Sequence, residues 1–278
     1  MPELFRFLKR NRPVNIAILL LYYAVVVLPH KWFGTFLNTE VFSRMSRSQY
    51  NKTVLIIFVI LLMMIIIHFI KSIRTNPKKL ILTSTLLFSL LLAIIISKTL
   101  FVINIEMVHF PQYAILAILL LPLCGDMFQA LIIATLAGGI DEAYQYFILA
   151  PDDTGYYDFN DVVTNLVGAA IGIIYARAVG WAQIKSRQFI GSPAFYMLIL
   201  ITSILLLLRS LNILTIYPSA GGVVSLVVYQ PPTFWSQLPL GLVYHVLTPL
   251  EGTIIIILLW AVYAIFFRRF FDTKSLQP

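Results

Sequence analysis

Cysteine is almost missing from this chain, in which Cys124 is the only one. A single cysteine excludes an intrachain disulfide framework and a cysteine-based metal cluster. Charged residues are also sparse, because they make up 12% of the chain, whereas soluble proteins carry about 25%. An ordinary soluble globular domain is therefore excluded.

Several functional signatures are missing as well. The sequence contains neither Gly-x-Ser-x-Gly nor His-Glu-x-x-His, so it carries neither of these hydrolase motifs. The absence of an internal repeat, with few ionisable groups in the middle of the apolar runs, disfavours a transporter. The net charge of +8 comes from short basic clusters between apolar runs, a pattern that indicates membrane topology and not a nucleic-acid partner.

Long apolar runs are what the chain has in abundance, since 60% of its residues are hydrophobic. A helix needs about 20 apolar residues to cross about 30 Å of hydrocarbon. We therefore expect an all-α polytopic transmembrane helical bundle of about eight spans. The expected spans are Val14–Leu28, Thr53–Ile70, Leu80–Ser97, Val108–Leu123, Met127–Leu149, Val162–Val179, Ala194–Ile216 and Thr253–Phe267.

The basic residues predict how these spans are oriented. Most of them fall in alternate connecting segments, which the positive-inside rule places in the cytoplasm. Both termini are then cytoplasmic, in a multi-pass protein of the bacterial cytoplasmic (inner) membrane. Pro2–Lys9 is expected to form a short interfacial helix, and no small-residue cleavage site follows the first apolar run, so we expect that run to stay uncleaved.

Polar residues gather at the predicted outer side of the fourth to sixth spans. A charge inside a span costs about 2.5–3.5 kcal/mol on insertion scales, so such residues indicate function. Helical spacing places each group on one face of its helix, and we expect the three groups to form one polar site. The groups are Glu106, His109 and Tyr113; Asp141, Glu142 and Gln145; and Asp158, Asp161 and Asn165.

Simpler roles remain open for some residues of these spans. Asp158 or Asp161 is a natural cap for the sixth span, and Tyr22 and Tyr23 are more typical of packing than of a site. Arg209 lies at a depth that makes it a candidate counter-ion for the acids. Glycines at 168 and 172 continue the face of Asn165 and predict a close helix–helix approach.

Three motifs in this region resemble those of the VanZ-like family of membrane proteins. They are His109-Phe-Pro-Gln-Tyr113, Asp141-Glu-Ala-Tyr-Gln145 and Asp161-Val-Val-Thr-Asn165-Leu-Val-Gly168. The resemblance covers roughly residues 80–180, and Asp158 matches an acid often seen three residues before the Asp. It implies a small helical membrane module and a link to resistance against the glycopeptide teicoplanin.

The resemblance divides the chain into three parts. Residues 1–79 are a two-span N-terminal extension, 80–180 the VanZ-like core, and 181–278 a two-span C-terminal extension with an apolar outer loop. That loop, Tyr217–Glu251, has no lysine or arginine. It is expected to lie in the outer membrane interface or dip into the bilayer, or to be an ordered loop packed on the helix ends.

Three functions compete for this chain. The first is an outer-leaflet polar pocket that binds a lipid-linked or amphiphilic ligand, with membrane lipids or lipid-linked precursors as partners and no cofactor. The second is a membrane-embedded hydrolase or transferase, with Asp141 or Glu142 as base and His109 as acid or metal ligand. The third is a transporter. The spacing of these residues matches no strong metal motif, so no metal is expected from the sequence alone.

Overall fold

The computed structural model describes residues 2–36, 39–40, 43–74, 76, 78–101, 104–149, 155–180, 189–218, 222–228, 236–237 and 243–269. Within these residues the fold is all-α apart from two pairs of two-residue strands. Among the described residues, six helices are long and apolar enough to cross a membrane: α4 (Arg47–Ile73), α5 (Lys79–Thr99), α6 (His109–Cys124), α8 (Phe159–Ala178), α9 (Pro193–Ser210) and α10 (Pro249–Arg269). The protein is therefore an integral membrane protein that crosses the bilayer several times.

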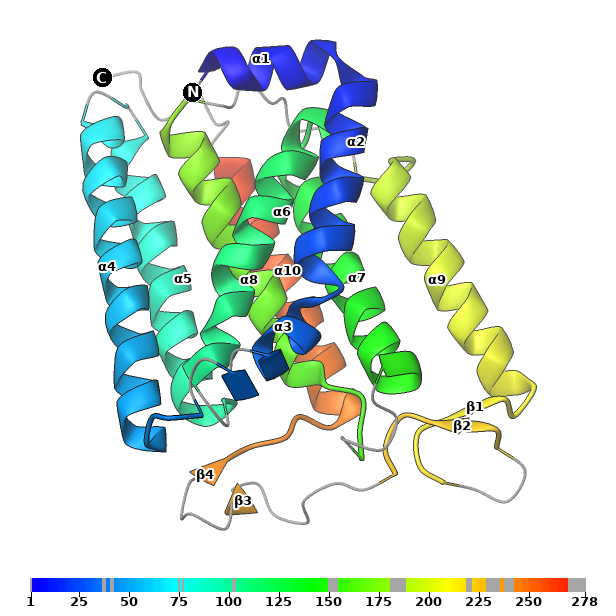
Figure 1. Ribbon diagram of the computed structural model, residues 1–278. Helices are drawn as coiled ribbons and strands as arrows, with labels where there is room; N and C mark the ends of the chain where they lie inside the picture. The colour runs from blue at the N-terminus through cyan, green and yellow to red at the C-terminus, as the bar shows by residue number, and fades with distance from the viewer. Residues whose placement is uncertain are drawn as a thin grey trace.

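Two further helices run beside these six in Figure 1. Helix α2 (Arg12–Tyr22) continues as a π-helix, η1 (Tyr23–Val27), and α7 (Met127–Tyr144) continues as a π-helix, η4 (Gln145–Leu149). Both lie where the sequence predicts spans, but α2 is short and α7 carries two acids near its end. The total of eight spans stays a prediction.

The described residues also include two short helices. Helix α1 (Pro2–Arg10) lies across one end of the bundle in Figure 1, where the sequence predicts an interfacial helix. Helix α3 (His30–Phe36) follows η1, and the sequence did not predict it. A 3-10 helix, η3 (Asn104–Val108), leads into α6.

Helix α8 is the centre of the bundle. It packs against α4, α5, α6, α7 and α10, and most of its side chains are buried. In contrast, α4 and α9 expose apolar side chains along most of their length, as expected for helices that face lipid. Buried polar groups on α8 are therefore held inside protein and shielded from acyl chains.

Glycines bring α6 and α8 into backbone contact. A Cβ atom at Gly168 would lie 2.6 Å from the Phe110 carbonyl oxygen, and one at Gly172 would collide with the Ala114 backbone. Only glycine fits at these two positions, because backbone atoms cannot move aside as side chains do. The close approach that the sequence predicts at this face is confirmed, with α6 as the partner.

Tyrosine hydroxyls attach α2 and η1 to the core. Tyr22 donates a hydrogen bond to the Gln112 carbonyl on α6 at 2.8 Å, and Tyr23 donates one to the Ala137 carbonyl on α7 at 2.8 Å. Asn15, which is fully buried, donates from Nδ2 to the Leu119 carbonyl at 3.3 Å. The predicted packing role of the two tyrosines is confirmed.

The strands lie at the end of the bundle opposite α1 (Figure 1). β1 (Leu214–Thr215) pairs in parallel with β2 (Val224–Ser225), and β3 (Ser236–Gln237) pairs antiparallel with β4 (Val243–Tyr244). Val227 bridges to Tyr156, just before α8. Residues 219–221, 229–235 and 238–242 of the predicted Tyr217–Glu251 loop lie outside the described residues. The position of this loop relative to the membrane stays a prediction.

The expected end of the seventh span is wrong. The sequence predicts a helix to Ile216, but α9 ends at Ser210, after which Asn212 takes a left-handed backbone conformation with φ of 54° and β1 begins. A residue in the left-handed region cannot continue a right-handed helix. Arg209 therefore lies in the last turn of α9.

Basic helix ends gather at one end of the bundle. The end of α4, the start of α5 and the ends of α8 and α10 lie at the α1 end in Figure 1, and each carries basic residues. This grouping is the one that the sequence predicts for the cytoplasmic side. Which side of the membrane this end faces stays a prediction.

Candidate functional site

Seven of the predicted site residues meet at the end of α6, α7 and α8 that lies away from α1. All three pairs of these helices are in contact. Five of the seven side chains are at most 4% exposed, and Gln145 is 8% exposed. The residues are His109, Tyr113, Asp141, Glu142, Gln145, Asp161 and Asn165.

His109 joins α6 to α8 through both ring nitrogens. Its Nδ1 lies 2.9 Å from Asn165 Oδ1, and its Nε2 lies 3.3 Å from Asp161 Oδ2. An amide oxygen can only accept, so Nδ1 carries the hydrogen of this bond. A methyl group at Gly138 would lie 2.9 Å from Asn165 Nδ2, so glycine on α7 leaves room for this pair.

The acids of α7 are each held by a neighbour. Tyr113, whose ring stacks on His109 at 6.4 Å between centroids, donates to Asp141 Oδ2 at 3.1 Å. Gln145 lies one turn after Glu142 and donates from Nε2 to Glu142 Oε1 at 3.0 Å. These bonds fix the direction of both carboxylates, as a pre-organised site requires.

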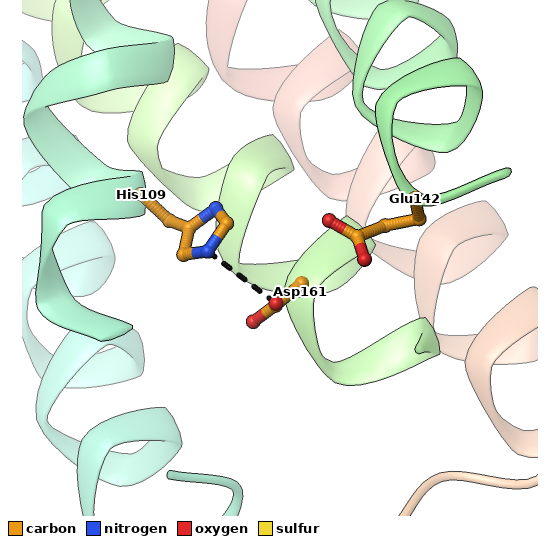
Figure 2. A group of neighbouring side chains, drawn as sticks. All are labelled: His109, Glu142 and Asp161. Atoms are coloured by element: carbon orange, nitrogen blue, oxygen red, sulfur yellow. Dashed lines mark ion pairs between the residues drawn. The ribbon is translucent and has the colours of Figure 1, made fainter. Parts of the chain in front are cut away.

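The two acids at the start of α8 have different roles. Asp158 is the N-cap, and its Oδ1 accepts from the Asn160 and Asp161 backbone amides at 2.8 and 3.4 Å. Asp161 lies one turn into the helix, and its carboxylate forms an ion pair with His109 in Figure 2, with a ligand atom of Glu142 within 4.8 Å. Its side chain is 18% exposed, so this carboxylate connects the buried site with the surface.

Two secondary candidates are not part of this group. Glu106 lies in η3, before α6 begins, and is half-buried outside the cluster of His109, Glu142 and Asp161. Arg209 is exposed on α9, and within the described residues no ion pair joins it to Asp141 or Glu142. The counter-ion role of Arg209 stays a prediction, and α9 lies at the edge of the bundle in Figure 1, where it contacts α7.

Two residues near the site escaped sequence reasoning. Asn160 donates from Nδ2 to the Leu100 and His245 carbonyls at 3.1 and 2.8 Å, and its Oδ1 accepts from the Leu247 amide at 2.9 Å. This one side chain therefore ties α8 to the end of α5 and to the segment before α10. In the sequence Asn160 lies just before the predicted sixth span, and its burial, which marks it in the structure, cannot be read from the sequence.

The second such residue is Tyr157. Its hydroxyl donates to the Gly139 carbonyl on α7 at 2.7 Å. Desolvation, together with the nearby carboxylates of Glu142 and Asp158, raises the pKa of Tyr157 well above its ordinary value. The phenol therefore stays protonated and keeps α7 attached to the start of α8.

A second histidine–acid pair lies just before and within the start of α10. His245 Nε2 is 3.4 Å from Glu251 Oε2, and the same oxygen accepts from the Thr248 amide at 2.7 Å. Glu251 is 40% exposed at its side chain, and among the described residues no third acid, histidine or cysteine joins this pair. It resembles the His109–Asp161 pair in chemistry but caps a helix.

The site offers three ligand atoms that converge on one point. One atom each from His109, Glu142 and Asp161 lies within 4.8 Å of the other two, and Figure 2 shows the three side chains directed toward one another from three helices. An imidazole nitrogen with two carboxylates can hold a divalent metal, share protons, or bind a cationic group. The sequence predicted that these three groups share one polar site, but the spacing of the residues along the chain matched no metal motif.

Comparison with protein-family models, curated proteins and solved structures finds no match to this chain. The fold and the site thus define a class: a multi-span helical membrane protein with a buried acid–histidine cluster at one end of its central helices. The resemblance to the VanZ-like family stays a prediction from the motifs.

Proposed function

We propose that this protein binds the headgroup of a membrane lipid, or of a lipid-linked or amphiphilic ligand, at the end of α6, α7 and α8. The observation that carries the proposal is the arrangement of the site. Buried polar side chains from three helices meet there, and each is oriented by a neighbour. Networks of this kind are rare inside membrane helices because they are costly, and they mark binding or transport sites.

The surroundings suit a ligand that arrives from the bilayer. Asp161 is partly exposed at the end of the bundle, whereas α4, α9 and α10 present apolar side chains outward. A headgroup at this level can reach the carboxylate while its acyl chains remain in lipid. The positive-inside pattern would place this end at the outer leaflet of the bacterial cytoplasmic membrane.

The motifs that resemble the VanZ-like family support the same proposal. His109, Tyr113, Asp141, Glu142, Gln145, Asp161 and Asn165 are the motif residues, and they are the ones that meet in the site. We extend the proposal to a role in the response of the cell envelope to glycopeptides such as teicoplanin. A changed teicoplanin susceptibility on deletion of the gene would support this extension, and an unchanged one would contradict it.

Lipid retention tests the headgroup site directly. The purified full-length protein is examined by native mass spectrometry, and the bound lipids are extracted and identified. We expect His109→Ala and Asp161→Asn to lower lipid occupancy several-fold, because the first removes the imidazole and the second the negative charge of the carboxylate. Arg209→Gln is the control and should leave occupancy unchanged. Equal occupancy in all four proteins would contradict the proposal.

A membrane hydrolase or transferase is the second candidate. It is favoured by one observation, the approach of a buried carboxylate, Glu142, to the same point as His109. A base and an acid at this distance suit the attack of water on a headgroup ester. Turnover of the retained lipid by the wild type, lost in Glu142→Gln, would favour this candidate over simple binding.

A further inference from the structure

His109 has the local geometry of a metal-binding histidine. Such histidines donate one ring N–H to an oxygen acceptor, which fixes the tautomer and directs the other nitrogen at the ion. Here Nδ1 donates to Asn165 Oδ1, and Nε2 points at Asp161 Oδ2 from 3.3 Å. In that tautomer Nε2 bears a lone pair, so His109 Nε2 and Asp161 Oδ2 are both acceptors and face each other. Two acceptors this close require either a second proton or a cation between them.

The distance between the two acceptors suits a cation. Metal–ligand bonds of about 2.1 Å place neighbouring ligands about 3.0–3.4 Å apart. The separation of 3.3 Å between His109 Nε2 and Asp161 Oδ2 lies in this range. The third ligand atom, from Glu142, is within 4.8 Å of both, so a small side-chain rotation completes the set.

Glu142 supplies an independent indication of a ligand. Its side chain is 4% exposed, and within the described residues Gln145 Nε2 donates a hydrogen bond to its Oε1. The carboxylate points at His109 and Asp161 (Figure 2), and within the described residues no lysine or arginine forms an ion pair with it. A buried carboxylate is normally paired or bound to a metal.

We propose that His109 Nε2 and the carboxylates of Glu142 and Asp161 bind one divalent transition-metal ion, Mn²⁺ or Zn²⁺. The imidazole nitrogen favours Zn²⁺ over Mg²⁺ and Ca²⁺, and the two carboxylates also suit Mn²⁺. Asn165 and Gln145 are positioning residues that hold two of the ligands. Three protein ligands leave coordination positions open on the side where Asp161 reaches the surface.

The ion would also change what the site recognises. Without it, the acids repel an anionic headgroup, whereas a bound divalent cation attracts a phosphate oxygen to its open position. This second step rests on the proposed function, but the metal site itself does not. Metal binding is therefore measured with the ion alone. A variant that loses the metal but retains lipid, or loses lipid but retains the metal, separates the metal site from the headgroup site.

The experiment uses the full-length protein in detergent, stripped with a chelator and titrated with Mn²⁺ or Zn²⁺. We expect one ion per chain after desalting, measured by inductively coupled plasma mass spectrometry. Addition of the ion should also raise the midpoint of thermal unfolding. His109→Gln, Glu142→Gln and Asp161→Asn should each weaken binding at least tenfold. Asn165→Ala should weaken it about 10–100-fold through loss of the histidine's orientation.

The second histidine–acid pair provides a matched control. Glu251→Gln removes one acid at the same end of the bundle, in a pair of similar distance, and should leave the stoichiometry and the affinity unchanged. Absence of metal and of a thermal shift in the wild type would overturn the proposal and leave a protonated His109–Asp161 ion pair. Binding that survives in all three ligand variants would overturn it as well.

Discussion

His109 on α6 and Asn165 on α8 share a buried hydrogen bond of 2.9 Å between Nδ1 and Oδ1. The two residues are fixed by the closest helix contact in the site, because Gly168 and Gly172 on the Asn165 face let the α6 backbone approach. The bond therefore depends on both the glycines and the asparagine. This hydrogen bond holds the imidazole ring of His109 in its position in the site.

Removing the asparagine amide should destabilise the protein. Asn165→Ala leaves the buried Nδ1–H of His109 without its acceptor, which costs about 1–3 kcal/mol. The double variant with His109→Leu should recover part of this loss, because no polar group is then stranded. Denaturant or thermal unfolding in detergent measures both. Equal stability of Asn165→Ala and the wild type would show that the bond does not form.

The glycine contact makes its own prediction. Gly172→Ala places a methyl group against the Ala114 backbone, and the helices must separate to accept it. We expect a loss of about 1–3 kcal/mol and reduced ligand retention, since α6 carries His109. Gly34→Ala is the control, because a Cβ atom there meets nothing within 4 Å. Similar stability of the two variants would contradict the close packing of α6 and α8.

Asn160 should control the end of the bundle near the site. Asn160→Ala breaks the bonds to the Leu100 and His245 carbonyls and to the Leu247 amide. We expect a loss of about 2 kcal/mol or more and faster hydrogen exchange of the Leu247 amide. Thr253→Val, which removes only a bond from the side chain to the Pro249 carbonyl within α10, should leave that exchange unchanged. Slow exchange at Leu247 in both variants would contradict the role assigned to Asn160.

Side-specific labelling tests the predicted orientation. In a Cys124→Ser background, cysteine is placed at Val223, which is 79% exposed beside β2, or at Arg10 at the end of α1. An impermeant maleimide is added to intact cells, or to spheroplasts if an outer membrane would exclude the reagent. It should label position 223 and not position 10. The opposite pattern would place the candidate site on the cytoplasmic side.

Hydropathy alone predicted most of the bundle. α5, α6 and α8 begin and end within about three residues of their predicted bounds, because a span must be apolar over nearly its full length. The end of α9 was wrong, and α3, the π-helical segments and the strands were not predicted. Their residues are apolar or mixed like the helices beside them, and tertiary contacts decide their backbone conformation.

Helical spacing predicted which site residues share a face, but not which atoms meet. Asp158 and Asp161 look alike in the sequence, and the structure makes one a helix cap and places the other 3.3 Å from His109 Nε2. Arg209 shares its depth with the acids, yet α9 lies at the edge of the bundle. Convergence of His109, Glu142 and Asp161 depends on the packing of three helices, which no spacing within one helix encodes.

Electron spin-echo spectroscopy of the Mn²⁺-loaded protein tests most directly whether these three side chains act as one site. A directly bound imidazole nitrogen modulates the echo, so we predict nitrogen modulation in the wild type. It should be lost in His109→Gln and kept in His245→Gln, which changes the histidine of the other acid pair. Absence of nitrogen modulation in the wild type, or its persistence in His109→Gln, would contradict the account.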